Sequence, residues 1–150
     1  MLLCGIVDSK RIFLMIRTYK ELSRLKTFKE RFEYLRLNGS VGVDTFGFDR
    51  YLNQVFYQSA EWKKVRREVI IRDNGCDLGI EGLDIYDGLL VHHMNPITPD
   101  QIKHRDSDIL NPDFLIVTCD VTHKAIHYGI EDFERYLVFG ERSIGDTKLW

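Results

Sequence analysis

The chain has 150 residues and a formal net charge of −2, with 44% hydrophobic and 29% charged residues. This length suits one domain, and the composition excludes a wholly disordered chain. No apolar run approaches the roughly 20 residues of a membrane span, and the first residues lack the features of a secretory signal. Three cysteines are an odd count that argues against a disulfide framework, so we expect a cytoplasmic protein without a membrane partner.

Charge is unevenly distributed along the chain. Residues 1–72 carry 15 Lys and Arg against 8 Asp and Glu, whereas residues 73–150 carry 6 against 15. A basic first half is typical of a surface that docks phosphate groups, but helices with solvated Lys and Arg would give the same pattern. Charge alone leaves both interpretations open.

Three helices are predicted in the first half. Apolar residues at spacings of three and four predict a helix over 18–38. Asp44 or Thr45 is the candidate N-cap of a second helix that continues to residue 56. Ser59 is the candidate N-cap of a third helix over 60–72, whose outer face carries Lys and Arg.

Short strands and a final helix are predicted in the second half. The apolar runs Ile80–Tyr86 and Leu89–His93 are separated by Asp87–Gly88, which predicts a hairpin between them. The later elements are a polar loop over 94–113, a strand over 114–118, a helix over 120–128 ended by Gly129, and a weak helical stretch over 132–137.

Four of the five histidines fall into two tight groups. His123 and His127 are four residues apart on a predicted helix, so both can bind one ion from the same face. His92 and His93 are adjacent at a strand end, where side chains normally point to opposite faces, although an irregular loop relaxes this rule. Imidazole suits transition-metal ions, and three protein ligands with an open position are typical of a catalytic site.

The segments around these histidines resemble the HNH, or ββα-metal, endonuclease motif, in particular that of small bacteriophage HNH proteins and DNase-colicin nuclease domains. Four histidines, the strand–loop–strand–helix order and the closing His-Tyr-Gly coincide, over roughly residues 62–129. The two segments are Leu90-Val-His-His-Met-Asn-Pro-Ile97 and Leu115-Ile-Val-Thr-Cys-Asp-Val-Thr-His-Lys-Ala-Ile-His-Tyr-Gly129.

The resemblance implies a single α+β domain, in which helices over 1–60 pack on an HNH nuclease core over 61–130, with a tail over 131–150. The implied activity is metal-dependent hydrolysis of DNA phosphodiesters, by nicking or by double-strand cutting. A phage-encoded protein would act in the host cytoplasm, with DNA and a terminase or other packaging protein as partners. RNA stays open as a substrate, because backbone contacts distinguish it poorly from DNA.

The resemblance also implies roles for individual histidines. His92 and His123 would bind one divalent ion (Mg, Mn, Ni or Zn), and His127 would be a third ligand or a phosphate contact. His93 would be the general base that takes a proton from the attacking water. The ion would stabilise charge on the scissile phosphate.

Two departures from the family pattern stand out. Phe114 occupies the position where the family has the asparagine that fixes the loop of the base, so Asn111, a catalytic candidate, or Asn95 would have to substitute. Many relatives also hold a structural zinc ion with two Cys-x-x-Cys pairs. Here only Cys76 and Cys119 remain of the four ligands, so we expect no four-Cys zinc site, and packing alone should hold this region.

Basic residues on the helix over 60–72 are the candidate contacts to the DNA backbone, although a plain solvated helix face is the alternative. They are Lys63, Lys64, Arg66, Arg67 and Arg72. Two rival functions stay open. One is an HNH-fold module that binds DNA and cuts it weakly or not at all, which Phe114 favours. The other is a structural or adaptor protein in which a bound ion only stabilises the fold.

Overall fold

A pair of four-residue strands forms the centre of the fold. β3 (Leu90–His93) and β4 (Leu115–Thr118) are antiparallel, with His92 opposite Ile116. Every residue of β4 is buried, as expected for a strand that is covered on both faces. The computed structural model describes residues 15–37, 50–80 and 83–129.

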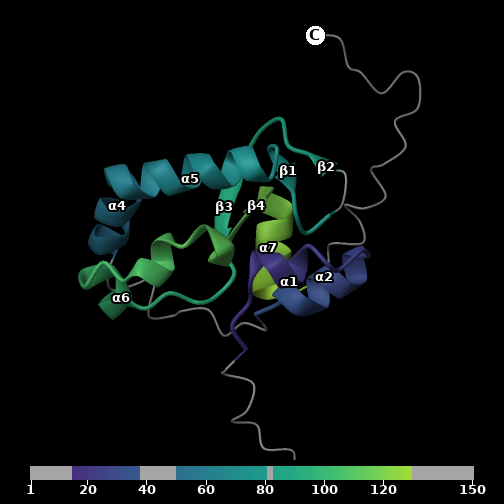
Figure 1. Ribbon diagram of the computed structural model, residues 1–150, viewed down its shortest axis with the longest axis horizontal. Coiled ribbons are helices and arrows are strands. Elements are labelled where there is room, and N and C mark those ends of the chain that lie inside the picture. The colour runs from purple at the N-terminus through teal and green to yellow at the C-terminus, as the bar shows by residue number, and fades with distance from the viewer. Residues whose placement is uncertain (1–14, 38–49, 81–82, 130–150) are drawn as a thin grey trace, which may run out of the picture.

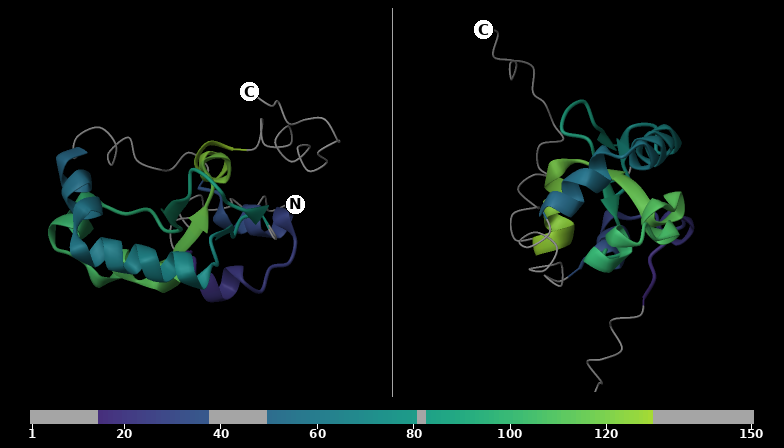
Figure 2. Two further views of the ribbon diagram at one scale, coloured as in Figure 1. Left: turned by 90° about the horizontal axis from the view of Figure 1, so that it is seen from above. Right: turned by 90° about the vertical axis from the view of Figure 1, so that its left-hand side faces the viewer.

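A helix covers each face of this strand pair (Figure 1). α5 (Ala60–Arg72) contacts both strands, and its Trp62 and Val69 side chains are buried. α7 (Asp120–Tyr128) follows β4 and packs against β3. Seen from above in Figure 2, α5 and α7 lie on opposite sides of the strands. The described residues thus form a mixed α+β fold with two small antiparallel sheets, which confirms the predicted class.

Local end signals define α5 and α7 as predicted. The Ser59 hydroxyl accepts a hydrogen bond from the Trp62 N–H and caps α5. Gly129 has φ +111 and ends α7, in a conformation that an L side chain rarely adopts. α4 (Arg50–Gln58) overlaps the second predicted helix and ends two residues after its predicted end, and the candidate N-caps lie outside the described residues.

The single helix predicted over 18–38 is wrong. The structure has two shorter helices there, α1 (Tyr19–Leu22) and α2 (Phe28–Leu35). Thr27 begins α2 with a capping box, in which its side chain and that of Glu30 each bind the other's backbone N–H. This cap restarts the helix while the apolar spacing continues, so periodicity alone overlooks the break.

The predicted hairpin around Asp87–Gly88 is also wrong. β2 (Leu83–Asp84) pairs with β1 (Cys76–Asp77), while β3 pairs with β4 across a long connection. A turn does form, because Gly88 has φ +68 and its N–H binds the Asp87 carboxylate. It joins strands of two different sheets: both residues of β2 are exposed, whereas β4, the partner of β3, is buried at every residue.

The predicted polar loop contains helical turns. Thr98 and Gln101 form a second capping box, with Pro99 in the first helical position of α6 (Pro99–Lys103). Two 3-10 turns follow, η2 (Ser107–Leu110) and η3 (Pro112–Phe114). These turns bring the backbone back to the start of β4.

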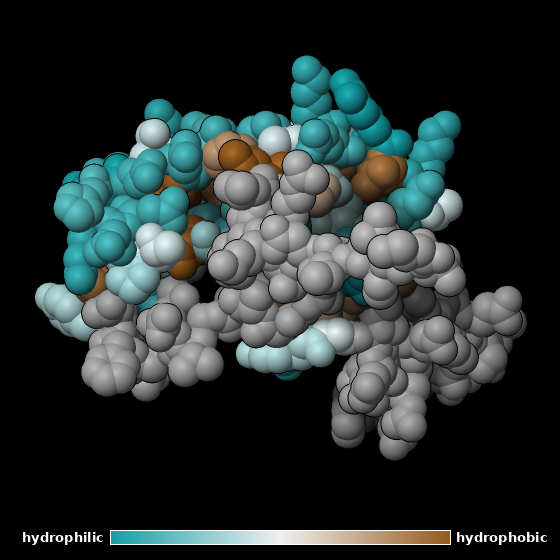
Figure 3. Space-filling model, turned by 90° about the horizontal axis from the view of Figure 1, so that it is seen from below, coloured by the Kyte–Doolittle hydropathy of each residue, from teal (hydrophilic) through white to brown (hydrophobic). Residues whose placement is uncertain are grey.

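The apolar core divides into layers on either side of the strands. One cluster joins α4, α5 and α6 around Trp62, and another joins α1, α2 and α7 around Met94. Hydrophilic residues predominate on the described surface of the face in Figure 3. No helix of the described part of the chain is long and apolar enough to cross a membrane. The predicted helical stretch over 132–137 lies outside the described residues.

Candidate metal centre

Three imidazoles meet between β3 and α7. His92, His123 and His127 each offer one ring nitrogen, and these three nitrogens all lie within 4.8 Å of one another. His92 is 3% exposed, and its Nε2 has no hydrogen-bond partner within the described ranges. A buried, unsatisfied nitrogen is costly unless an ion or another group binds it. Three imidazoles are a donor set that suits zinc, nickel, copper or manganese, so the group could hold a metal ion.

The fold fixes this arrangement from both sides. His123 and His127 are one helical turn apart on α7, and their Nε2 atoms are 3.1 Å apart. The register with β4 fixes His92, whose ring stands at 82° to His123 and 90° to His127. The backbone N–H of Leu37 binds the carbonyl of Ile126 and ties α7 to the end of α2.

Electrostatics keep the three imidazoles neutral. Burial, followed by repulsion from the other two rings, holds the pKa of His92 well below its ordinary value. Burial and then repulsion from His123 lower the pKa of His127 to about 4. Burial also lowers the pKa of His123. At neutral pH each ring therefore keeps the lone pair that a metal ion requires.

His93 lies on the opposite face of β3 and packs against α5. Its ring is stacked on Trp62, with centroids 5.1 Å apart and planes 17° from parallel. Its Nε2 lies 2.9 Å from the carbonyl oxygen of Ile109. Because a carbonyl only accepts, Nε2 carries the hydrogen and Nδ1 is the ring's free acceptor. Burial lowers the pKa of His93 to about 4, so the ring is unprotonated at neutral pH.

Both adjacent histidines nevertheless reach one cavity, of about 590 Å³. His93 reaches it beside α4, and His92 reaches it with His123 and His127. The expectation that a strand end lets neighbouring side chains share a pocket is thus met. The cavity is also lined by residues of α4 and of the segment after β3: Asn53, Gln54, Tyr57, Gln58, Asn95, Pro96 and Ile97.

The two candidate asparagines have different surroundings. Asn95 lines the cavity, and its amide binds both the N–H and the carbonyl of Arg17. Asn111 caps η3 by accepting from the Asp113 N–H, and it ends the η2 turn that contains Ile109. Asn111 is not among the described residues that line the cavity. Within the described residues, its link to His93 runs through the η2 backbone, where the Ile109 carbonyl contacts the imidazole.

Gly79 and Thr122, which follow Cys76 and Cys119 by three residues, make other contacts. Gly79 lies so close to Thr122 that an added Cβ would be 2.5 Å from its methyl group. The Cys119 thiol lies beside the Thr122 hydroxyl, at 3.4 Å. Sequence reasoning missed Asp77. Its buried carboxylate accepts hydrogen bonds from the backbone N–H groups of Gly79 and Cys119. Hydrogen bonds as well as packing therefore hold this region.

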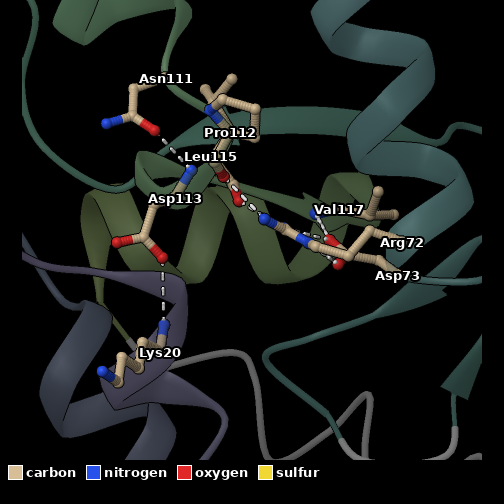
Figure 4. A network of polar contacts seen from close by, with 8 residues as sticks. All are labelled: Lys20, Arg72, Asp73, Asn111, Pro112, Asp113, Leu115 and Val117. Atoms are coloured by element: carbon tan, nitrogen blue, oxygen red, sulfur yellow. Dashed lines mark hydrogen bonds and ion pairs between the residues drawn. The ribbon is translucent and has the colours of Figure 1, made fainter.

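Four of the five candidate DNA contacts are exposed on α5, namely Lys63, Lys64, Arg66 and Arg67. Arg72 is different, since its guanidinium binds the carbonyls of Pro112 and Leu115 and the Asp73 carboxylate (Figure 4). It also lies 3.7 Å above the ring of Tyr19. Asp73 in turn accepts from the Val117 N–H. Arg72 thus joins α5 to β4 instead of facing a ligand, and we correct its assignment accordingly.

Comparisons with protein-family models, with curated proteins and with solved structures find no match to this chain. Function therefore has to be inferred from the chemistry of the site. Sequence reasoning named the four histidines that meet at the cavity, but it missed the Ile109 carbonyl and the amide-bearing face of α4.

Proposed function

We propose that this protein is a metal-dependent endonuclease of the HNH type that hydrolyses DNA phosphodiesters. The observation that carries the proposal is a three-imidazole group beside a fourth imidazole that a backbone carbonyl orients, with all four rings on one cavity. The antiparallel β3–β4 pair followed by α7 gives the strand–strand–helix order that a ββα-metal core requires.

His92, His123 and His127 would hold the ion, which fits the donor set and the unpartnered Nε2 of His92. A divalent ion at this place would supply Lewis acidity for the charge that develops on a scissile phosphate. A metal held by three protein ligands leaves room for substrate, which is typical of catalytic rather than structural sites.

His93 would take a proton from the attacking water at Nδ1. The Ile109 carbonyl holds the hydrogen on Nε2, so the correct tautomer is set before substrate arrives. The stack on Trp62 restricts rotation of the ring. A nearby phosphate would raise the low pKa of His93, because negative charge favours the protonated imidazole.

The exposed Lys and Arg side chains of α5 would dock the DNA backbone. Lys63, Lys64, Arg66 and Arg67 extend from the helix that also carries Trp62. Contacts to phosphates position a duplex without reading its sequence, so we expect little base specificity from this surface. The participation of a phage terminase or another packaging protein belongs to the same proposal and rests on the family resemblance alone.

The test is conversion of supercoiled plasmid to nicked or linear DNA. Purified protein would be stripped of metal and then supplied with Mg, Mn, Ni or Zn separately, alongside His93→Ala and, as a matched control, His104→Ala. His104 is exposed, and the contact of its ring with described residues is the Asp100 carbonyl one turn earlier. We expect ion-dependent conversion by the wild type and by His104→Ala, and a rate about 10²–10⁴-fold lower for His93→Ala.

Other outcomes would separate the rivals. DNA binding without conversion under any ion would favour a binding module. Unfolding of the protein on metal removal, with no conversion after metal is restored, would favour a structural role for the ion. Conversion by His93→Ala at the wild-type rate would show that His93 is not the base.

A further inference from the structure

The cavity beside the candidate metal centre has a second wall of a different chemical kind. α4 presents Asn53, Gln54, Tyr57 and Gln58 to it, on positions i, i+1, i+4 and i+5 of one helix face. Opposite chain segments add apolar side chains, among them Pro96 and Ile97. Apart from the histidines, the described residues that line the cavity have no ionisable group other than the phenol of Tyr57.

This wall is suited to a nucleobase better than to a phosphate. Phosphate is usually bound by Lys, Arg or clustered backbone N–H groups, and the described lining has no Lys or Arg. Side-chain amides instead match the donors and acceptors on base edges, as Asn and Gln do with adenine. At about 590 Å³ the cavity lies in the size range of pockets that enclose small organic ligands.

Tyr57 supplies an aromatic surface in this cavity. Its ring is braced by Phe56 at 65° and by Trp62 at 76°, so its orientation is fixed by the core. The residue is still 42% exposed and lines the cavity. Bases stack on such rings with little dependence on sequence, and a braced ring loses little conformational entropy on binding.

We propose that the α4 wall binds one unpaired nucleobase of the strand to be cut, by stacking on Tyr57 and by amide contacts from Gln54 and Gln58. This inference rests on the proposed function, because the base belongs to the nucleotide next to the scissile phosphate. The preferred substrate is then DNA with an extruded or unpaired nucleotide at the cleavage site, not uniform duplex. A base within a duplex would have to leave the stack, which costs least where it is already unpaired.

The test measures binding in the absence of metal, so that it does not depend on cleavage. Labelled 20-base-pair duplexes, fully paired or with one unpaired adenine, would be titrated with full-length protein in EDTA and followed by fluorescence anisotropy. The variants are Tyr57→Leu, Tyr57→Phe and the double variant Gln54→Ala with Gln58→Ala. Tyr51→Ala is the matched control, since Tyr51 is on α4, 75% exposed and not among the lining residues.

We expect the unpaired adenine to tighten wild-type binding about tenfold over the paired duplex. Tyr57→Leu and the double Gln variant should each lose most of this preference, whereas Tyr57→Phe and Tyr51→Ala should keep it. The Gln positions are exposed, so the double variant tests the pocket even where Tyr57→Leu weakens the fold.

Equal affinity of the wild type for the two duplexes would overturn the inference. An unchanged preference in both Tyr57→Leu and the double Gln variant would do the same. Plasmid cleavage with equal affinities would leave the nuclease in place and remove only the base pocket. A preference without cleavage under any ion would keep the pocket and remove the nuclease.

Discussion

His93 on β3 is stacked on Trp62 of α5, so one ring of the core fixes the plane of the imidazole that we assign as the base. Trp62 is 4% exposed and also contacts Phe56 and Tyr57. A buried core residue therefore lies directly under a candidate catalytic group. Changes at Trp62 should affect stability and cleavage together.

Replacing Trp62 with Ala should lower the free energy of unfolding by about 3–5 kcal/mol, because a large buried ring is lost and a cavity is left. Urea denaturation followed by circular dichroism would measure this loss. Ile71→Ala on the same helix is the control, since Ile71 is 71% exposed and its truncation should change stability by about 0.5 kcal/mol or less. Equal effects of the two substitutions would contradict the packing described for Trp62.

His123→Ala should weaken binding of zinc or nickel by about tenfold or more, because it leaves only two of the three candidate protein ligands. His93→Ala should leave the affinity nearly unchanged, since its ring lies on the other face of β3. Isothermal titration calorimetry on metal-stripped protein distinguishes the two. Comparable losses in both variants would mean that His93 is itself a ligand.

Arg72→Ala should destabilise the fold by about 3–5 kcal/mol without a specific effect on DNA affinity. The Asp73 side chain is fully buried beside Arg72 at 2.7 Å, and truncation of Arg72 would leave its carboxylate without the guanidinium. Arg67→Ala is the matched variant, because Arg67 is an exposed arginine of the same helix. Thermal denaturation should register the change in Arg72→Ala and almost none in Arg67→Ala.

Changing Lys63, Lys64, Arg66 and Arg67 together to Ala should lower DNA affinity and flatten its dependence on salt. Each phosphate contact that is lost should reduce the slope of log K against log salt by about 0.9. Titrations of a duplex at several salt concentrations would give this slope for the wild type and the variant. An identical slope would show that the α5 face is merely solvated.

The metal-free protein should lose stability as the pH falls from about 6.5 to about 4. Unfolded His93 takes up a proton near its ordinary pKa of about 6.5, whereas burial holds its folded pKa at about 4, so protons favour the unfolded state in this window. The loss of unfolding free energy that is due to His93 is at most about 3 kcal/mol, and it does not grow further below the folded pKa. Urea titrations across this range should show a shallower fall in His93→Gln than in the wild type.

Sequence reasoning succeeded where the signals are local. Ser59 and Gly129 mark the ends of α5 and α7 by caps that depend on a few neighbouring residues. The pairing of β3 with β4 is not local, because a long connection joins the two strands. The Asp87–Gly88 turn is a local signal, and it favours pairing of β3 with the preceding run instead. The capping box at Thr27 was a readable signal that the apolar spacing obscured, and the capping box at Thr98 lies in a segment whose polar composition predicts a loop.

In the candidate site, too, sequence reasoning succeeded with local signals and failed with long-range contacts. The spacing of His123 and His127 predicts that they share a face, since a helix has a fixed period. The partner of His93 is a backbone carbonyl, which any residue provides, so no residue type marks Ile109 in advance. Arg72 looks like its basic neighbours in the sequence, and only the position of Asp73 and of β4 separates it from them.

Alternation along β3 has a consequence for how such a site can change. His92 turns toward α7 and His93 toward α5, so the candidate metal ligands and the proposed base are supported by separate halves of the core. Under the proposed function, substitutions in the α7 layer would alter which ion the three imidazoles hold, while the ring over Trp62 keeps its place. Substitutions in the α5 layer would alter the proposed proton transfer at His93, while the three candidate ligands stay intact. If the proposed function holds, this four-residue strand would make metal choice and reactivity two traits that can change independently.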